Sequence, residues 1–140
     1  MTELSATTSE VIDRWIHADP DPRTVIRIET LRSDSESFDR AFGQPLKFGT
    51  AGLRGKMGPG PGSMNRLVMR VAAKAIANQL IADDLTQKGI VIGYDARIES
   101  DLYALDAARI FQSMSIECLL VEGPIPTPVL ARLVTSRGFG

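Results

Sequence analysis

Residues 47–55 read Lys-Phe-Gly-Thr-Ala-Gly-Leu-Arg-Gly. Three glycines and an alanine leave room for backbone N–H groups to approach an anion closely. Arg54 adds a planar guanidinium with five hydrogen-bond donors, which suits a phosphate group. The stretch therefore predicts a phosphate-facing loop; a tight corner that carries a solvated arginine is the alternative.

The composition limits the classes of partner. The chain has 140 residues, with 16 basic and 17 acidic side chains and a formal net charge of −1. A near-neutral surface has no general field that attracts nucleic acid or anionic lipid, so we expect neither as a partner. Residues 1–10 lack the basic flank and apolar core of a signal peptide, and no apolar run approaches the length of a membrane span.

Cysteine and histidine are each used once. Cys118 lies in the apolar run 116–121, which predicts a small buried side chain and fits a reducing cytoplasm. One histidine and one cysteine cannot build a His/Cys metal cluster.

Three short helices are predicted before residue 45. Apolar residues recur at helical spacing over 10–17. A second helix is expected to start with Asp21 as its N-cap and Pro22 in its first turn. Asp34 is expected to cap a third helix, which ends at Gly43.

From residue 46 the pattern alternates between strands and helices. Strands are predicted at 46–53, 90–94 and 118–121, and helices at 65–83, 100–114 and 129–136. Such alternation is typical of a largely parallel sheet between two layers of helices. We therefore predict an α/β fold: a helical extension over 1–44, then a three-layer α/β/α sandwich over 45–140 whose sheet is mostly parallel and lacks its last strand.

Residues 48–55 resemble the N-terminal signature of the α-D-phosphohexomutases, which include phosphoglucomutases, phosphomannomutases and phosphopentomutases. Three further landmarks follow in the family's order: Met64-Asn65, Gly93-Tyr94-Asp95-Ala96-Arg97 and Pro126-Thr127-Pro128. The segment from Trp15 to Thr24 is similar to the lead-in of the phosphopentomutase-like branch. The resemblance implies domain I, the N-terminal domain of a four-domain enzyme.

The resemblance also implies a reaction. Phosphohexomutases move phosphate between the C1 and C6 (or C5) hydroxyls of a hexose or pentose monophosphate, through a phosphoserine and a sugar bisphosphate intermediate. Mg²⁺ holds the phosphoserine, and a sugar bisphosphate activates the enzyme. The remaining domains of the parent enzyme are then the partners of this chain.

Four residues match positions of the family's active site. Arg54 matches the signature arginine near the phosphoserine and is the candidate catalytic residue, since it would offset charge on the transferring group. Thr50 and Gly52 match the same loop, and Arg97 matches a supporting position, so these three are substrate-binding candidates. For Arg97, a pair with Asp95 that merely fixes a turn is the alternative.

The family's serine loop, Thr-Ala-Ser-His-Asn-Pro, and its Asp-Gly-Asp metal loop do not occur in these residues. We therefore expect no magnesium ligands in this chain and no catalysis by it alone. The alternative is a free-standing module that binds a sugar phosphate or a partner without catalysis. A dinucleotide-binding domain is disfavoured, because residues 58–62 lack Gly-x-Gly-x-x-Gly spacing and their prolines remove N–H donors.

Overall fold

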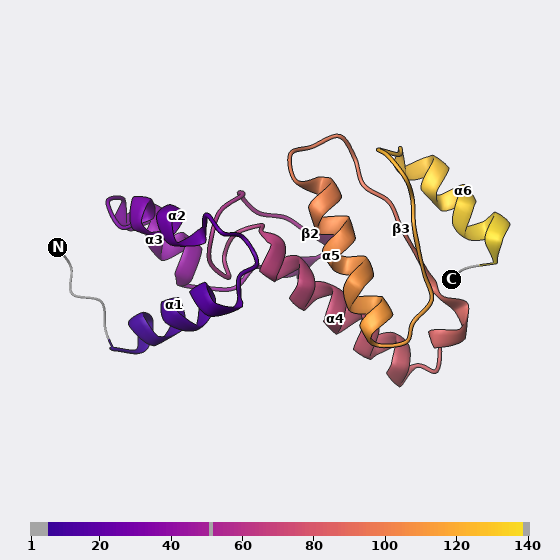
Figure 1. Ribbon diagram of the computed structural model, residues 1–140, viewed down its shortest axis with the longest axis horizontal. Helices are drawn as coiled ribbons and strands as arrows, with labels where there is room; N and C mark the ends of the chain where they lie inside the picture. The colour runs from indigo at the N-terminus through magenta and orange to yellow at the C-terminus, as the bar shows by residue number, and fades with distance from the viewer. Residues whose placement is uncertain (1–5, 51, 139–140) are drawn as a thin grey trace. The chain divides into compact units, whose positions relative to one another are not determined.

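The computed structural model describes residues 6–50 and 52–138 (Figure 1). The chain divides into two compact units, Met1–Val68 and Met69–Gly140. The predicted boundary between an extension at 1–44 and a domain at 45–140 stays a prediction.

The first unit begins with the three predicted helices. They are α1 (Ala6–Ala18), α2 (Thr24–Leu31) and α3 (Ser35–Phe42). Their buried core consists of Ile12, Ile28 and Phe38, with partly buried apolar residues packed around it. Because one apolar residue comes from each helix, the three short helices stabilise one another.

Aromatic side chains extend this core. Phe42 stacks on Phe38, with 5.1 Å between the ring centroids. Trp15 meets Phe42 edge to face at 6.4 Å, and its indole N–H donates to the Asp19 carboxylate at 3.1 Å. Trp15 thus packs apolar surface while its one polar atom is satisfied.

The predicted cap at Asp34 is confirmed, whereas the predicted cap at Asp21 is wrong. Asp34 caps α3, since its carboxylate accepts from the Ser37 N–H at 3.3 Å, and the helix ends at Gly43. Asp21 does not start α2, which begins later, at Thr24. Its carboxylate instead accepts from the backbone N–H of Arg23 at 3.0 Å and from the guanidinium of Arg27 at 2.9 Å.

Asp21 is a buried carboxylate held by two arginines. Burial alone would raise its pKa, but hydrogen bonds from Arg23 and the charge of Arg27 outweigh burial and hold the pKa below the ordinary 3.8. The carboxylate therefore stays ionised and links the α1–α2 connection to the first turn of α2.

The predicted single strand over 46–53 is wrong. The chain forms a hairpin of two short antiparallel strands, β1 (Phe48–Gly49) and β2 (Gly52–Leu53). Gly52 has φ of 87°, a left-handed conformation that reverses the chain and that few other residues adopt. The two glycines and the threonine of this stretch allow the turn, and the prediction of one continuous strand overlooked them.

The glycine- and proline-rich loop after the hairpin docks on the end of α3. The Gly62 N–H donates to the Ala41 carbonyl at 2.8 Å, and the Leu46 N–H donates to the Pro61 carbonyl at 2.9 Å. A Cβ atom on Gly62 would overlap the Arg40 carbonyl oxygen. The contact is between backbones, so a side chain at residue 62 would prevent it.

Asn65 closes this loop and starts the next helix. Its amide nitrogen donates to three carbonyls of the loop, those of Gly58 at 2.9 Å, Gly60 at 2.9 Å and Ser63 at 3.0 Å. Its Oδ1 accepts from the Val68 N–H at 2.9 Å, as an N-cap does. Asn65 is therefore the N-cap of α4 (Arg66–Ala82).

The second unit contains the predicted parallel strands, β3 (Ile90–Ile92) and β4 (Cys118–Leu120). They are joined through α5 (Ser100–Ser113), and α6 (Thr127–Arg137) follows β4. Figure 1 shows the two strands between α5 and α6; α5 contacts both strands and α6 contacts β3. This arrangement confirms the α/β class and the α/β/α layers. A short 3₁₀ helix, η1 (Thr86–Lys88), precedes β3.

The core of this unit is built on small residues. Ala73 and Ala77 of α4 form one buried cluster with Ala107 and Phe111 of α5 and with Ile116. Alanines let the two helices approach closely, and Phe111 fills the space that they leave. Cys118 packs against the cluster but is only partly buried, short of the buried position predicted for it, and burial raises the pKa of its thiol.

One ion pair in the second unit was not predicted. Asp106 is fully buried on α5, and Arg70 of α4 donates to its carboxylate at 2.7 Å. A buried carboxylate is tolerated only where donors replace its water. The pair therefore fixes how α4 and α5 face each other.

We predict that Gly62→Ala destabilises the first unit by about 2 kcal/mol, because the added methyl group forces the loop away from α3. Trp15 is the chain's one tryptophan and lies in this unit, so its fluorescence during urea unfolding reports the change. Gly58→Ala is the matched control, since a Cβ there meets only the Ser63 side chain at 3.5 Å. Equal stability of the two variants would contradict docking through the backbone.

We predict that Arg70→Met costs about 3 kcal/mol, because it removes a donor from a fully buried carboxylate. The double variant Arg70→Met/Asp106→Leu should recover most of this loss. Both tyrosines, Tyr94 and Tyr103, belong to the second unit, and their fluorescence follows its unfolding. Arg109→Met, at an exposed position of α5, should change stability by less than about 0.5 kcal/mol; an equal effect of both arginine variants would refute the role of the pair.

Candidate functional site

The hairpin at residues 48–53 carries two of the four predicted site residues. Phe48 pairs with Leu53, and Gly49 with Gly52, which leaves Thr50 exposed in the turn. A Cβ atom added to Gly52 would meet nothing within 4 Å. The glycine is thus required by its backbone conformation, and the space above it is open to a ligand.

Arg54 comes directly after β2 and is exposed. Among the described residues its guanidinium has no hydrogen bond or ion pair, so all five of its donors face solvent or a ligand. The preceding hairpin holds its backbone, whereas the side chain itself is unconstrained. Its predicted catalytic role stays a prediction.

Arg97 lies in the second unit, in the turn between β3 and α5. Its Nε donates to the Asp95 carboxylate at 2.8 Å, and its backbone N–H donates to the same carboxylate at 3.1 Å. The side chain is 85% exposed, and in the described part of the chain its two Nη atoms have no partner. The turn-fixing contact weighed for this residue is therefore present, and it leaves donors for a ligand.

Asp95 is the centre of this turn. The Ser100 hydroxyl donates to its carboxylate at 2.8 Å. Hydrogen bonds from Ser100 and from the Arg97 backbone, followed by the Arg97 guanidinium, hold the pKa of Asp95 below the ordinary 3.8. The carboxylate stays charged at neutral pH, so it keeps Arg97 in place. Glu99, whose φ is 63°, is the N-cap residue of α5, and its side chain makes no capping hydrogen bond.

The structure thus brings Thr50, Gly52 and Arg54 together on one hairpin and places Arg97 on a separate turn of the second unit. Sequence reasoning missed a pocket of about 460 Å³ in the first unit, lined by residues of α2, α3 and the segment 56–63. Its lining residues are far apart in the sequence, so no local pattern could have revealed it.

Two further findings concern metals and membranes. Within residues 6–50 and 52–138, no three His, Cys, Asp or Glu side chains lie close enough together to hold a metal ion. The helices of the described chain are all too short or too polar to cross a bilayer.

Comparison with known proteins gives a family and several relatives. Residues 45–139 match the model of phosphoglucomutase/phosphomannomutase, alpha/beta/alpha domain I. The human phosphopentomutase is 35% identical over 125 residues, which cover 82% of this chain and 20% of that protein. A phosphoglucomutase of Staphylococcus haemolyticus is 39% identical over 105 residues, covering 72% of this chain and 19% of the relative.

A phosphomannomutase of Mycoplasmoides pirum is 26% identical over 119 residues, which cover 81% of this chain and 21% of that protein. No solved structure matches the chain significantly. The chain spans about a fifth of the length of the curated relatives it matches. The family match covers more than half of the chain and coincides with the predicted sandwich, so the chain belongs to the phosphoglucomutase/phosphomannomutase family and carries its α/β/α domain I.

Proposed function

We propose that this chain forms the first domain of an enzyme that moves phosphate between the C1 and C6 (or C5) hydroxyls of a sugar monophosphate. The names of its relatives, phosphopentomutase, phosphoglucomutase and phosphomannomutase, support a sugar phosphate as the substrate. The observation that carries the proposal is the exposed Arg54 guanidinium, which has no partner among the described residues and follows the open turn at Gly52.

The proposed reaction has two phosphoryl transfers. A phosphoserine outside these residues gives its phosphoryl group to the free hydroxyl of the sugar monophosphate, which becomes a bisphosphate, and the hydroxyl proton leaves to a base. The bisphosphate reorients, and its other phosphate returns to the serine. Arg54 donates to the phosphoryl oxygens and offsets their charge during transfer.

The other candidates position the substrate. The Thr50 hydroxyl and the Gly52 N–H lie in one turn, where both can donate to an oxygen of the same phosphate. The Nη atoms of Arg97 supply further donors, and Asp95 fixes the direction of that side chain. Mg²⁺ would be held by residues other than those described and would supply positive charge at the phosphoserine. We further propose that a sugar bisphosphate primes the serine and that the enzyme works in the cytoplasm.

The test offers glucose 1-phosphate and ribose 1-phosphate to the gene product that contains this chain and follows the appearance of the 6- and 5-phosphates. Conversion of either supports the mutase and identifies the sugar. Binding of these esters without conversion would support the alternative, a module that binds sugar phosphate without catalysis. If the protein neither binds nor converts these esters, the mutase and the binding module are both refuted.

We predict that Arg54→Ala lowers kcat/KM of this reaction by about 10²- to 10³-fold, because one electrostatic contact to the transferring group is lost. Folding should change by less than about 0.5 kcal/mol, since the side chain is exposed and has no partner among the described residues. Arg32→Ala, at an exposed position after α2, is the matched control and should leave the kinetics unchanged. A large loss of stability in Arg54→Ala would instead assign the residue a structural role.

We predict that Asp95 titrates below 3.8, because donors at Ser100 and Arg97 stabilise its charged form. Carboxyl NMR of the 140-residue chain measures this pKa directly, and Ser100→Ala and Arg97→Gln should each raise it. The contribution of Asp95 to stability is therefore present above pH 3.8 and is lost as the pH falls through the lowered value. An unchanged pKa in both variants would contradict the turn described above.

A further inference from the structure

We propose that the pocket of the first unit binds a phosphate monoester with a compact carbon skeleton, at a site separate from the hairpin that carries Arg54. The pocket has a volume of about 460 Å³, within the range of about 300–1,000 Å³ that is usual for small-molecule sites. The Arg54 side chain does not line it. This site goes beyond the proposed function and does not depend on it.

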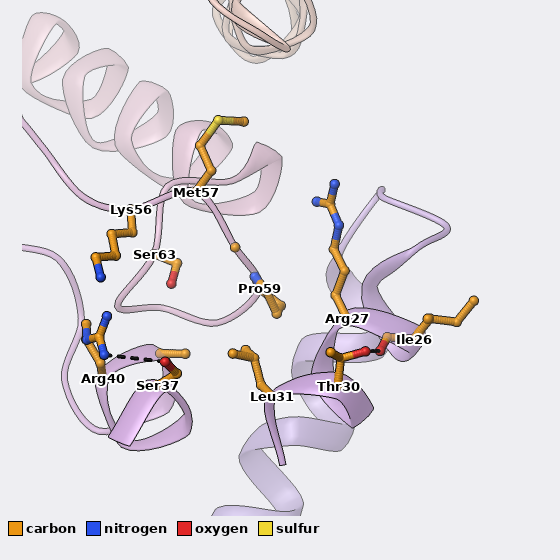
Figure 2. Close-up of a pocket in the computed structure, with 12 residues that line it drawn as sticks. Ile26, Arg27, Thr30, Leu31, Ser37, Arg40, Lys56, Met57, Pro59 and Ser63 are labelled. Atoms are coloured by element: carbon orange, nitrogen blue, oxygen red, sulfur yellow. Dashed lines mark hydrogen bonds between the residues drawn. The ribbon is translucent and has the colours of Figure 1, made fainter. Parts of the chain in front are cut away.

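Two cations face the same part of the pocket. Figure 2 shows the side chains of Lys56 and Arg40 directed toward one another, with the hydroxyls of Ser37 and Ser63 beside them. None of the twelve described residues that line the pocket is an aspartate or glutamate. Two like charges in one concave space repel each other, and an anion between them would reverse the sign of the interaction.

The contacts that these cations make within the protein are weak. Arg40 donates to the Ser37 hydroxyl at 3.4 Å and to Glu36 at 3.5 Å, and the Glu36 side chain is 90% exposed. Such an exposed pair contributes little energy. Among the described residues the Lys56 ammonium has no ion pair. An entering anion therefore need not break a strong contact.

Arg27 lines the other side of the pocket and is already engaged by Asp21 at 2.9 Å. Figure 2 shows its guanidinium well apart from Lys56 and Arg40. It contributes positive potential at the rim, and its place in the fold is set by Asp21. The anion is therefore assigned to the Lys56 and Arg40 side.

Ser63 supplies a further hydrogen-bond donor in the pocket. The residue is 8% exposed, and its hydroxyl has no hydrogen-bond partner among the described residues although it lines the pocket. No side-chain oxygen or nitrogen of the described residues is both buried and unpaired, so the Ser63 hydroxyl is accessible from the pocket and can donate to an entering phosphate.

The backbone under the site is fixed before a ligand arrives. The Met64 N–H donates to the Lys56 carbonyl at 2.8 Å, and the Gly58 N–H donates to the Met64 carbonyl at 3.2 Å. Arg40 lies in α3, whose C-terminal end holds Gly62. Lys56 and Ser63 therefore belong to one rigid loop, which lowers the entropy lost on binding.

The hydrogen-bond donors and the apolar lining of the pocket together indicate the class of ligand that fits it. Two cations and two hydroxyls match the three terminal oxygens and the double charge of a phosphate monoester better than the two oxygens of a carboxylate. Leu31, Ala41 and Pro59 give the pocket an apolar wall that inorganic phosphate would leave exposed. A phosphate ester with a small carbon portion uses both features.

The test titrates the 140-residue chain with phenyl phosphate, inorganic phosphate and benzoate, and follows backbone amides by NMR. We expect saturable binding of phenyl phosphate with shifts at Lys56, Gly58 and Ser63, and affinities at least tenfold weaker for inorganic phosphate and benzoate. No saturation by phenyl phosphate, or equal affinity for benzoate, would overturn the proposal.

Variants separate this site from the hairpin. Lys56→Met and Arg40→Met should each weaken phenyl phosphate binding about tenfold or more, because each loses a charge-assisted hydrogen bond. Lys74→Met, at an exposed position of α4, should leave the binding unchanged. Loss of binding in Arg54→Gln with retention in Lys56→Met would assign the ligand to the hairpin and overturn the second site. If a variant does not fold, the amide shifts of the unmodified chain still decide the question.

Discussion

The first unit depends on one backbone contact, between the carbonyls that end α3 and the glycine loop. Helix C-termini leave carbonyls without partners, and here the Gly62 N–H satisfies that of Ala41 at 2.8 Å. Gly60 and Gly62 are close enough to α3 for an added Cβ to overlap its carbonyls. The contact fixes the path of the chain beyond the hairpin, and with it the wall of the pocket and the place of Lys56.

Asn65 connects the docked loop to the first turn of α4 by hydrogen bonds. Its amide nitrogen binds three carbonyls of the loop, and its oxygen caps the first turn of α4. One side chain therefore satisfies groups on both sides of a junction, as buried polar groups generally require. A loop of prolines and glycines, which has little regular structure of its own, becomes rigid because its ends are fixed by α3 and by Asn65.

Local features of this fold could be predicted from the sequence, and features that depend on distant residues could not. Apolar spacing predicts the helices, and the cap at Asp34 needs only neighbouring residues. The βαβ unit follows from alternation, since parallel strands need a crossover. By contrast, the pair of Arg70 and Asp106 joins residues 36 apart, and neither residue differs in pattern from an exposed one. The same holds for Arg40 and Lys56, whose common pocket exists only after the loop has docked.

Gly52 of the family signature and Gly62 of the following loop are required for different reasons. At Gly52 the restriction is conformational: φ is 87°, yet a Cβ would meet nothing within 4 Å. At Gly62 the restriction is space, because protein backbone occupies the position of the missing side chain. A glycine that packs against its own protein has no room for a ligand, whereas one in an open turn leaves its N–H accessible. The open turn is therefore the place where a phosphate could reach the backbone, and it lies next to Arg54, a signature side chain whose guanidinium has no partner among the described residues.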